Sequence, residues 1–317
     1  MVKLQKLAIA LALGIALCTV QAEGQAGDVG SYRLEVAVDE VGLTFHAADK
    51  QGLPVNDLKV DDLKVLDNGK PVRKVVAFQV MQEHPIRAGI LLDTSRSMEP
   101  HLRGDRAIAA HYAQRVLRQK SDSAFVMEFG LSWRMTEPWS SDGARLTTAL
   151  SRVVAGRQNW IGGTALFDAV FRACFNEFGK VPRAESGKFI LLFSDGADNA
   201  SHVTLSEAVN MCQQSDVAIY AFRADPTPGA SSSGPKMLVD LTEQTGGRVF
   251  HDDDSEEAVD ADLHIIEGEM RNQYRLVYTP AELAHDGAFH RIELHVPQRV
   301  GNITVRTGYY APGPAKE

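Results

Sequence analysis

The stretch Gly89–Ser97, with the sequence GILLDTSRS, joins an uninterrupted apolar run to one carboxylate and two spaced hydroxyls. Apolar runs of this kind are typical of strands that are buried on both faces of a parallel sheet. Because side chains alternate along an extended chain, Asp93, Ser95 and Ser97 are expected to point the same way. The stretch therefore predicts a buried parallel strand that ends in a group of oxygen ligands.

Two further segments carry oxygen-bearing side chains next to other expected elements. A second apolar run, Phe189–Phe193, is followed by Ser194–Gly196 (SDG), and Gly162–Thr164 (GGT) places a hydroxyl before a helical pattern. Ligands of open parallel sheets bind at the carboxyl ends of the strands, where such segments meet. A single aspartate after a strand is more often a helix or turn cap. Three segments of matching chemistry favour a shared site.

This set of donors suits a hard divalent cation. Mg2+ prefers about six oxygen ligands in a near-octahedral array and keeps several waters. Two carboxylates and three hydroxyls hold such an ion and leave a coordination position open. The predicted ligands of Mg2+, or alternatively of Mn2+ or Ca2+, are Asp93, Ser95, Ser97, Thr164 and Asp195.

This pattern resembles the metal-ion-dependent adhesion site of the von Willebrand factor A domain, which has Asp-x-Ser-x-Ser, then Thr, then Asp. Order and spacing match, as do Met98 after the first motif and Gly196 after the last aspartate. The resemblance implies that the serines and the threonine contact the metal, while both aspartates act directly or through water. It also implies that a partner protein presents an Asp or Glu carboxylate to the ion. Arg96 stands where glycine is common in the family, and it either favours an acidic ligand or points into solvent.

Length and composition limit the classes of protein to which the chain can belong. The chain has 317 residues, of which 44% are hydrophobic and 23% are charged, as in ordinary globular proteins. This length predicts one large domain and a smaller one. The net charge of −8 argues against a nucleic-acid partner, because a phosphate backbone attracts basic surfaces.

The first residues have the pattern of a signal peptide. Lys3 and Lys6 form a positive start, Leu7–Leu17 is an apolar stretch too short to span a bilayer, and Val20–Ala22 fits a cleavage site. We therefore expect a signal peptide at residues 1–22. The mature chain is expected in the periplasm or cell envelope or secreted, with no membrane span after cleavage.

Residues 84–271 predict an α/β fold: a doubly wound, Rossmann-like, mostly parallel six-stranded sheet, as in a von Willebrand factor A domain. A short run after Gly130 is expected to pair antiparallel to the others. The expected strands are 86–92, 124–129, 134–137, 188–193, 217–222 and 248–250. The expected helices are 103–119, 144–154, 165–178, 205–214, 236–245 and 256–271.

The flanking segments, 28–83 and 272–312, are strand-like. Asn68-Gly69 predicts a tight hairpin turn, and Ile303–Tyr309 reads as one strand. Neither segment has enough strands for a core of its own, so we expect one discontinuous, Ig-like β-sandwich with the α/β domain inserted. The ending Gly308–Pro312, with an Asp-Gly-Lys-like turn in the first half, resembles bacterial secreted von Willebrand A-related proteins common in Acidobacteria, and this resemblance spans nearly the whole mature chain.

Cys174 and Cys212 lie on the apolar faces of two expected helices. Two buried thiols that pack as small hydrophobic groups are the simpler interpretation. An oxidising compartment also permits a bridge between neighbouring helices, but the sequence does not give the spacing between them.

The acidic run Asp252–Glu257 (DDDSEE) lacks the ligand spacing of an EF-hand. Acidic residues and a serine before a helical pattern favour an N-terminal cap over a calcium site.

The sequence favours binding over catalysis. It has no Gly-x-Ser-x-Gly elbow, no His-Glu-x-x-His motif and no Cys/His zinc spacing, and its 10 histidines are dispersed. We therefore expect no enzyme, but a metal-dependent protein-binding or adhesion module outside the cytoplasm. The alternative is a structural component of envelope assembly in which the metal only stabilises the α/β domain.

Overall fold

The structure is a computed structural model that describes residues 40–156, 163–182, 186–224, 233–251, 255–282 and 285–313. The expected signal peptide at 1–22, the first part of the expected sandwich at 28–39, and Gly162 lie outside the described residues. The described residues belong to one compact unit, so the domain boundaries expected at 83/84 and 271/272 stay predictions. Within these ranges no helix has both the length and the apolar character needed to cross a membrane.

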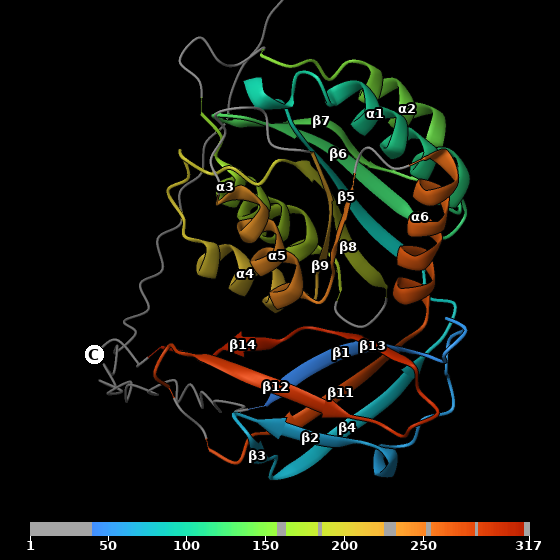
Figure 1. Ribbon diagram of the computed structural model, residues 1–317, viewed down its shortest axis with the longest axis vertical. Helices are drawn as coiled ribbons and strands as arrows, with labels where there is room; N and C mark the ends of the chain where they lie inside the picture. Colours follow the sequence, from blue (N-terminus) through green and yellow to red (C-terminus); the bar gives the residue numbers. More distant parts are fainter. Residues whose placement is uncertain are drawn as a thin grey trace, which may run out of the picture. The chain divides into compact units, whose positions relative to one another are not determined.

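A six-stranded sheet forms the centre of the α/β part, in the order β10-β9-β8-β5-β6-β7 (Figure 1). All neighbouring strands pair in parallel except β7, which is antiparallel to β6, as expected for the run after Gly130. The strands are β5 (Ile86–Asp93), β6 (Ser123–Phe129), β7 (Trp133–Ser140), β8 (Gly187–Ser194), β9 (Ala218–Arg223) and β10 (Val249–His251).

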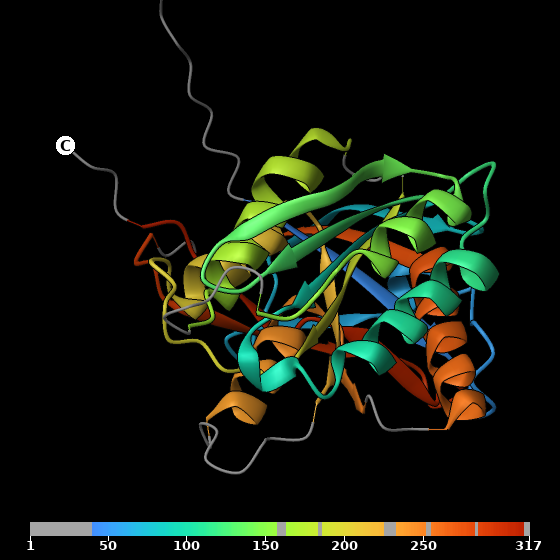
Figure 2. The same ribbon diagram turned by 90° about the horizontal axis from the view of Figure 1, so that it is seen from above.

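Helices cover both faces of this sheet (Figures 1 and 2). One face packs against α1 (Leu102–His111), α2 (Gly143–Ser151) and α6 (Glu256–Arg271). The other face packs against α3 (Leu166–Arg172), α4 (Leu205–Gln214) and α5 (Gly234–Thr245). Burial on both faces explains the near-continuous apolar sequences of the central strands.

Two predicted helices are shorter than expected as regular α-helices. After α1 the chain continues in a π-helical segment, η3 (Tyr112–Val116). After α3 it continues in another, η4 (Ala173–Glu177), and then in the 3-10 turn η5 (Phe178–Lys180). The periodicity of the sequence does not separate these wider and tighter turns from α-helix, because their apolar faces still align over a few residues.

Two four-stranded sheets make up the rest of the described chain, in the orders β13-β1-β11-β4 and β14-β12-β2-β3. Each sheet combines early and late strands, because β1 pairs with β11 and β2 pairs with β12, both antiparallel. Their apolar faces share one core. The strands are β1 (Val41–Ala48), β2 (Lys64–Asp67), β3 (Lys70–Pro71), β4 (Lys74–Met81), β11 (Gln273–Thr279), β12 (Phe289–His295), β13 (Asn302–Val305) and β14 (Gly308–Tyr310).

The turn between β2 and β3 confirms the hairpin prediction. Asn68 and Gly69 both have positive φ angles, 48° and 75°, and this dipeptide adopts such a backbone conformation readily. The 3-10 turn η1 (Val60–Asp62) precedes β2. That the two sheets form an Ig-like sandwich into which the α/β domain is inserted stays a prediction.

The expectation of one strand over Ile303–Tyr309 is wrong. The extended conformation is interrupted at Arg306 and Thr307. As a result, β13 pairs with β1 in one sheet and β14 pairs with β12 in the other. Arg306 Nη2 donates to Gly42 O at 2.5 Å, and Thr307 N donates to Glu243 O at 3.1 Å. The alternating sequence is compatible with one strand, but these contacts hold the connection between two sheets.

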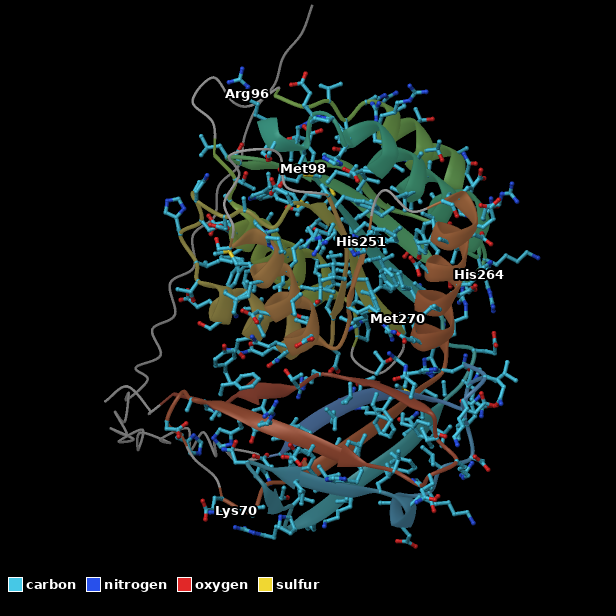
Figure 3. All side chains as sticks on the ribbon, viewed as in Figure 1. Lys70, Arg96, Met98, His251, His264 and Met270 are labelled. Atoms are coloured by element: carbon cyan, nitrogen blue, oxygen red, sulfur yellow. A yellow bond between two sulfur atoms is a disulfide. The ribbon has the colours of Figure 1, made fainter. Side chains whose placement is uncertain are left out.

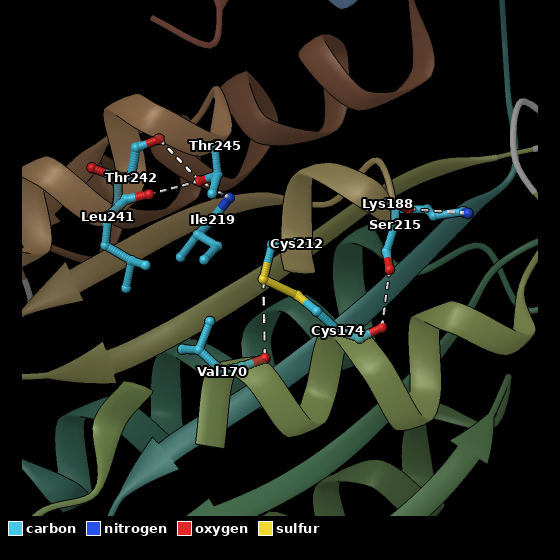
Figure 4. Close-up of a disulfide and its surroundings, with 9 residues drawn as sticks. All are labelled: Val170, Cys174, Lys188, Cys212, Ser215, Ile219, Leu241, Thr242 and Thr245. Carbon is cyan, nitrogen blue, oxygen red and sulfur yellow. Dashed lines mark hydrogen bonds between the residues drawn. A yellow bond between two sulfur atoms is a disulfide. The ribbon is translucent and has the colours of Figure 1, made fainter. Parts of the chain in front are cut away.

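Cys174 and Cys212 form a disulfide between η4 and α4 (Figure 4). The simpler interpretation of the sequence, two free buried thiols, is therefore wrong. The surrounding backbone is also bonded, since Ser215 Oγ donates to Cys174 O at 3.1 Å. Disulfides persist in oxidising compartments, which agrees with the export expected from the N-terminal sequence.

At the start of α6, Ser255 Oγ accepts a hydrogen bond from Ala258 N at 3.3 Å, and Glu256 and Glu257 occupy the first turn. This confirms the capping interpretation for the end of the acidic run. Asp252–Asp254 lie outside the described residues.

A buried ion pair joins the entry and exit of the α/β part. Arg271 Nη2 donates to Asp122 Oδ2 at 2.6 Å, and each residue is 2% exposed. Asp122 also accepts from Ile86 N at 2.9 Å, while Arg271 Nη1 donates to His84 O at 3.1 Å. Burial alone would raise the pKa of Asp122, but the guanidinium and backbone N–H groups hold it below its usual value. The pair thus fixes the first strand of the sheet against the end of α6.

We predict that Arg271→Met lowers the free energy of unfolding by about 3–5 kcal/mol, because it leaves Asp122 buried without its cation. Urea unfolding followed by circular dichroism measures the change. Lys236→Met is the control, because the Lys236–Asp240 pair has side chains 77% and 33% exposed. It should change stability by less than about 0.5 kcal/mol. Equal effects of the two substitutions would contradict the role given to Arg271.

Candidate metal site

The pairing of β5 with β8 brings the two aspartate segments to one edge of the sheet. Leu92 lies opposite Phe193 in parallel register, so Asp93 and Ser194 leave the sheet side by side. On the other side of β5, Thr94 N donates to Phe129 O at the end of β6, at 2.7 Å. The convergence expected from the two apolar runs is present.

The first motif folds back on itself after Asp93. Ser95 N donates to Asp93 Oδ1 at 2.8 Å, and the hydroxyls of Ser95 and Ser97 are 3.2 Å apart. The 3-10 turn η2 (Arg96–Met98) turns the chain and buries Met98. The Arg96 side chain is exposed and points away from the fold (Figure 3). Three of the five predicted ligands therefore lie together.

The last motif brings Asp195 to the same place. Ser194 Oγ donates to Asp93 Oδ2 at 2.8 Å and accepts from Gly196 N at 3.0 Å. Ala197 N donates to Asp195 Oδ1 at 3.0 Å. Asp195 Oδ2 is buried, and it has no hydrogen-bond partner among the residues that the structure describes. A buried carboxylate oxygen without a donor is costly unless a cation or a water meets it.

Gly196 is required by this turn. Its φ is +80°, and a Cβ there would lie 2.2 Å from Gly234 O at the start of α5. The glycine after the aspartate thus permits the close contact between the two segments.

Thr164 is held by the loop that carries Asp195. Its N–H donates to Asn199 Oδ1 at 2.8 Å, and its carbonyl accepts from Asn199 N at 3.0 Å and Ala200 N at 3.1 Å. Asp198 Oδ2 accepts from Phe167 N at 2.9 Å in the first turn of α3. Ser194, Asp198 and Asn199 take part in this arrangement although none of them belongs to the predicted ligand set. All three belong to the polar stretch that directly follows the apolar strand ending at Phe193, and this position could have identified them as candidates.

The site concentrates negative charge. Burial, and then the charge of Asp195, raise the pKa of Asp93 from its usual value to about 7, against the hydrogen bonds from Ser95 and Ser194. The two carboxylates thus repel each other in a place that water does not reach freely. This repulsion, the unpartnered Asp195 Oδ2 and the all-oxygen donor set fit a hard divalent cation.

No protein-family model and no curated protein matches the chain. Among solved structures, the conserved hypothetical protein BatB from Bacteroides thetaiotaomicron is 18% identical, with a TM-score of 0.45 over 57% of this chain and 97% of its own. An aerotolerance-related membrane protein from Bacteroides fragilis is 17% identical, with a TM-score of 0.46 over 57% of this chain and 98% of its own.

Proximal thread matrix protein 1 from the mussel byssus, with a zinc-occupied MIDAS motif, is 15% identical, with a TM-score of 0.46. That match spans 65% of this chain and half of the mussel protein. All three TM-scores are below 0.5, so these likenesses carry no argument about this chain.

We predict that Asp93→Asn removes a pH dependence of stability from the metal-free protein. The raised pKa means that folded Asp93 holds a proton between pH ~4 and ~7 when the unfolded chain does not. The free energy of unfolding therefore falls as pH rises through this window, by up to about 4 kcal/mol. At pH 8, and after treatment with chelator, the variant should be more stable than the wild type.

Urea unfolding at pH 5 and pH 8, with chelator and with Mg2+, measures this difference. Mg2+ should stabilise the wild type at pH 8 and leave the Asp93→Asn variant almost unchanged, because the amide carries no charge. The same pH slope in both metal-free proteins would show that Asp93 titrates normally.

Proposed function

We propose that this chain is a divalent-metal-dependent protein-binding module of the von Willebrand factor A type that acts outside the cytoplasm. The observation that carries the proposal is the pair of buried carboxylates, Asp93 and Asp195, at the ends of neighbouring parallel strands. One oxygen of the pair is buried without a donor within the described residues, and burial beside the other carboxylate raises the pKa of Asp93.

In this proposal the chain supplies charge and orientation. Ser95, Ser97 and Thr164 provide neutral oxygen ligands, while Asp93 and Asp195 provide the negative charge directly or through water. A bound Mg2+, Mn2+ or Ca2+ would supply a positive charge with a coordination position open to a carboxylate of the partner. Arg96 is exposed next to the two serines, and its charge favours the same acidic partner.

The location outside the cytoplasm has two supports. The N-terminal pattern is that of a signal peptide, and Cys174 and Cys212 are bridged. The remaining strands are proposed to form the Ig-like sandwich of residues 28–83 and 272–312, because early and late strands pair in both four-stranded sheets. This arrangement is the one suggested by the resemblance to secreted von Willebrand A-related proteins.

A pull-down by the mature protein from its native envelope or culture fluid, with Mg2+ and with chelator, tests the proposal. The binding of a specific protein should require Mg2+, and Asp195→Asn should abolish it, because the amide removes one of the two charges of the site. Asp240→Asn is the control for a lost carboxylate. Circular dichroism in chelator should show an intact fold. Collapse of the fold would instead support the structural role of the metal.

We further predict that the partner binds through one carboxylate. Changing the critical Asp or Glu of the partner to its amide should cost about 2–5 kcal/mol of binding free energy, while its neighbours cost much less. Thr164→Ala should weaken the complex with a smaller loss of Mg2+ affinity than Asp195→Asn shows. Titration calorimetry measures both affinities. A complex that survives chelation and every acid-to-amide change would exclude metal-mediated binding.

A further inference from the structure

Arg223 is a basic residue at the same sheet edge as the candidate metal site. β9 pairs in parallel with β8, and Arg223 lies opposite Ser194, the residue before Asp195. Neighbouring strands are about 4.8 Å apart. Arg223 is therefore one strand away from the loop that holds the second carboxylate.

The Arg223 guanidinium has no acidic partner among the residues that the structure describes. Its Nη2 lies 3.4 Å from His251 Nδ1 at the end of β10, and its Nε is buried without a hydrogen-bond partner in those same ranges. By contrast, Arg134 near the start of the hairpin strand β7 donates from Nε to Glu128 Oε1 at 2.8 Å. A buried N–H without an acceptor costs free energy that an incoming acceptor recovers.

The guanidinium has the chemistry for a second carboxylate. Nε and one Nη of arginine can donate two parallel hydrogen bonds to the two oxygens of a carboxylate. In Arg223 the first of these donors is unpartnered in the described structure, and the second has a long contact with a histidine. A positive charge one strand away from the metal site also attracts a negatively charged partner.

We propose that Arg223 binds a second acidic side chain of the partner whose first carboxylate meets the metal. This inference rests on the proposed function and names its partner: an extended segment with acidic residues at positions i and i+2. Such residues lie on one face of an extended chain, about 7 Å apart. The candidate ligands lie at the ends of β5 and β8, so Arg223 on β9 is one to two strand spacings away, about 5–10 Å, and both groups can be engaged at once.

Two short peptides provide the test. The mature protein with Mg2+ is titrated by NMR with Gly-Glu-Gly-Glu-Gly and with Gly-Glu-Gly-Gln-Gly, both capped at their ends. The wild type should bind the first about tenfold more tightly. Arg223→Gln should bind both equally, with Mg2+ affinity unchanged, and Arg223→Lys should keep part of the preference. Arg291→Gln, on an exposed position of β12, is the charge-matched control and should behave like the wild type.

The outcomes separate the inference from the proposed function. If peptide binding requires Mg2+ but the wild type shows no preference for the second acid, the role of Arg223 is wrong and metal-mediated binding stands. If the Arg223→Gln variant still prefers the peptide with two acids, the role of Arg223 is also wrong and metal-mediated binding again stands. If neither peptide binds in a Mg2+-dependent way, the proposed function fails, and the inference fails with it.

Discussion

The parallel pairing of β5 with β8 is the constraint on which the candidate site depends. Parallel strands send their carboxyl ends to one edge, and the register of Leu92 with Phe193 sets Asp93 beside Ser194. Neither aspartate could meet the other if one strand were reversed or displaced. The two helix layers matter because they bury both faces of these strands and so hold the register.

The same pairing has an electrostatic cost. Two carboxylates come close where solvent is largely excluded, and the metal-free fold responds by favouring a protonated Asp93. Ser194 relieves part of the strain through its hydrogen bond to Asp93, but Asp195 Oδ2 gains no donor within the described chain. A fold that tolerates this arrangement is prepared for a cation, because the ion removes the repulsion that the strands create.

Buried polar contacts also fasten the other strands. Asp67 at the end of β2 accepts hydrogen bonds from the Tyr278 and Tyr309 hydroxyls at 3.0 and 2.9 Å, and its Oδ1 lies 3.2 Å from His290 Nδ1. These residues come from strands of both four-stranded sheets. A satisfied network of this kind specifies which strands meet, since any other pairing leaves a buried carboxylate without donors. It therefore complements the Asp122–Arg271 pair at the base of the α/β part.

The sequence by itself determined the strand and helix order, the antiparallel place of β7, the Asn68-Gly69 turn and the motifs that hold the candidate ligands. These features depend on periodicity and local spacing, which a single chain displays directly. Tertiary structure alone decided the break at Arg306, the Cys174–Cys212 bridge and the place of Arg223 beside Ser194. Each depends on a distance between segments far apart in the chain. Only packing sets such distances, because no local pattern encodes which strands become neighbours.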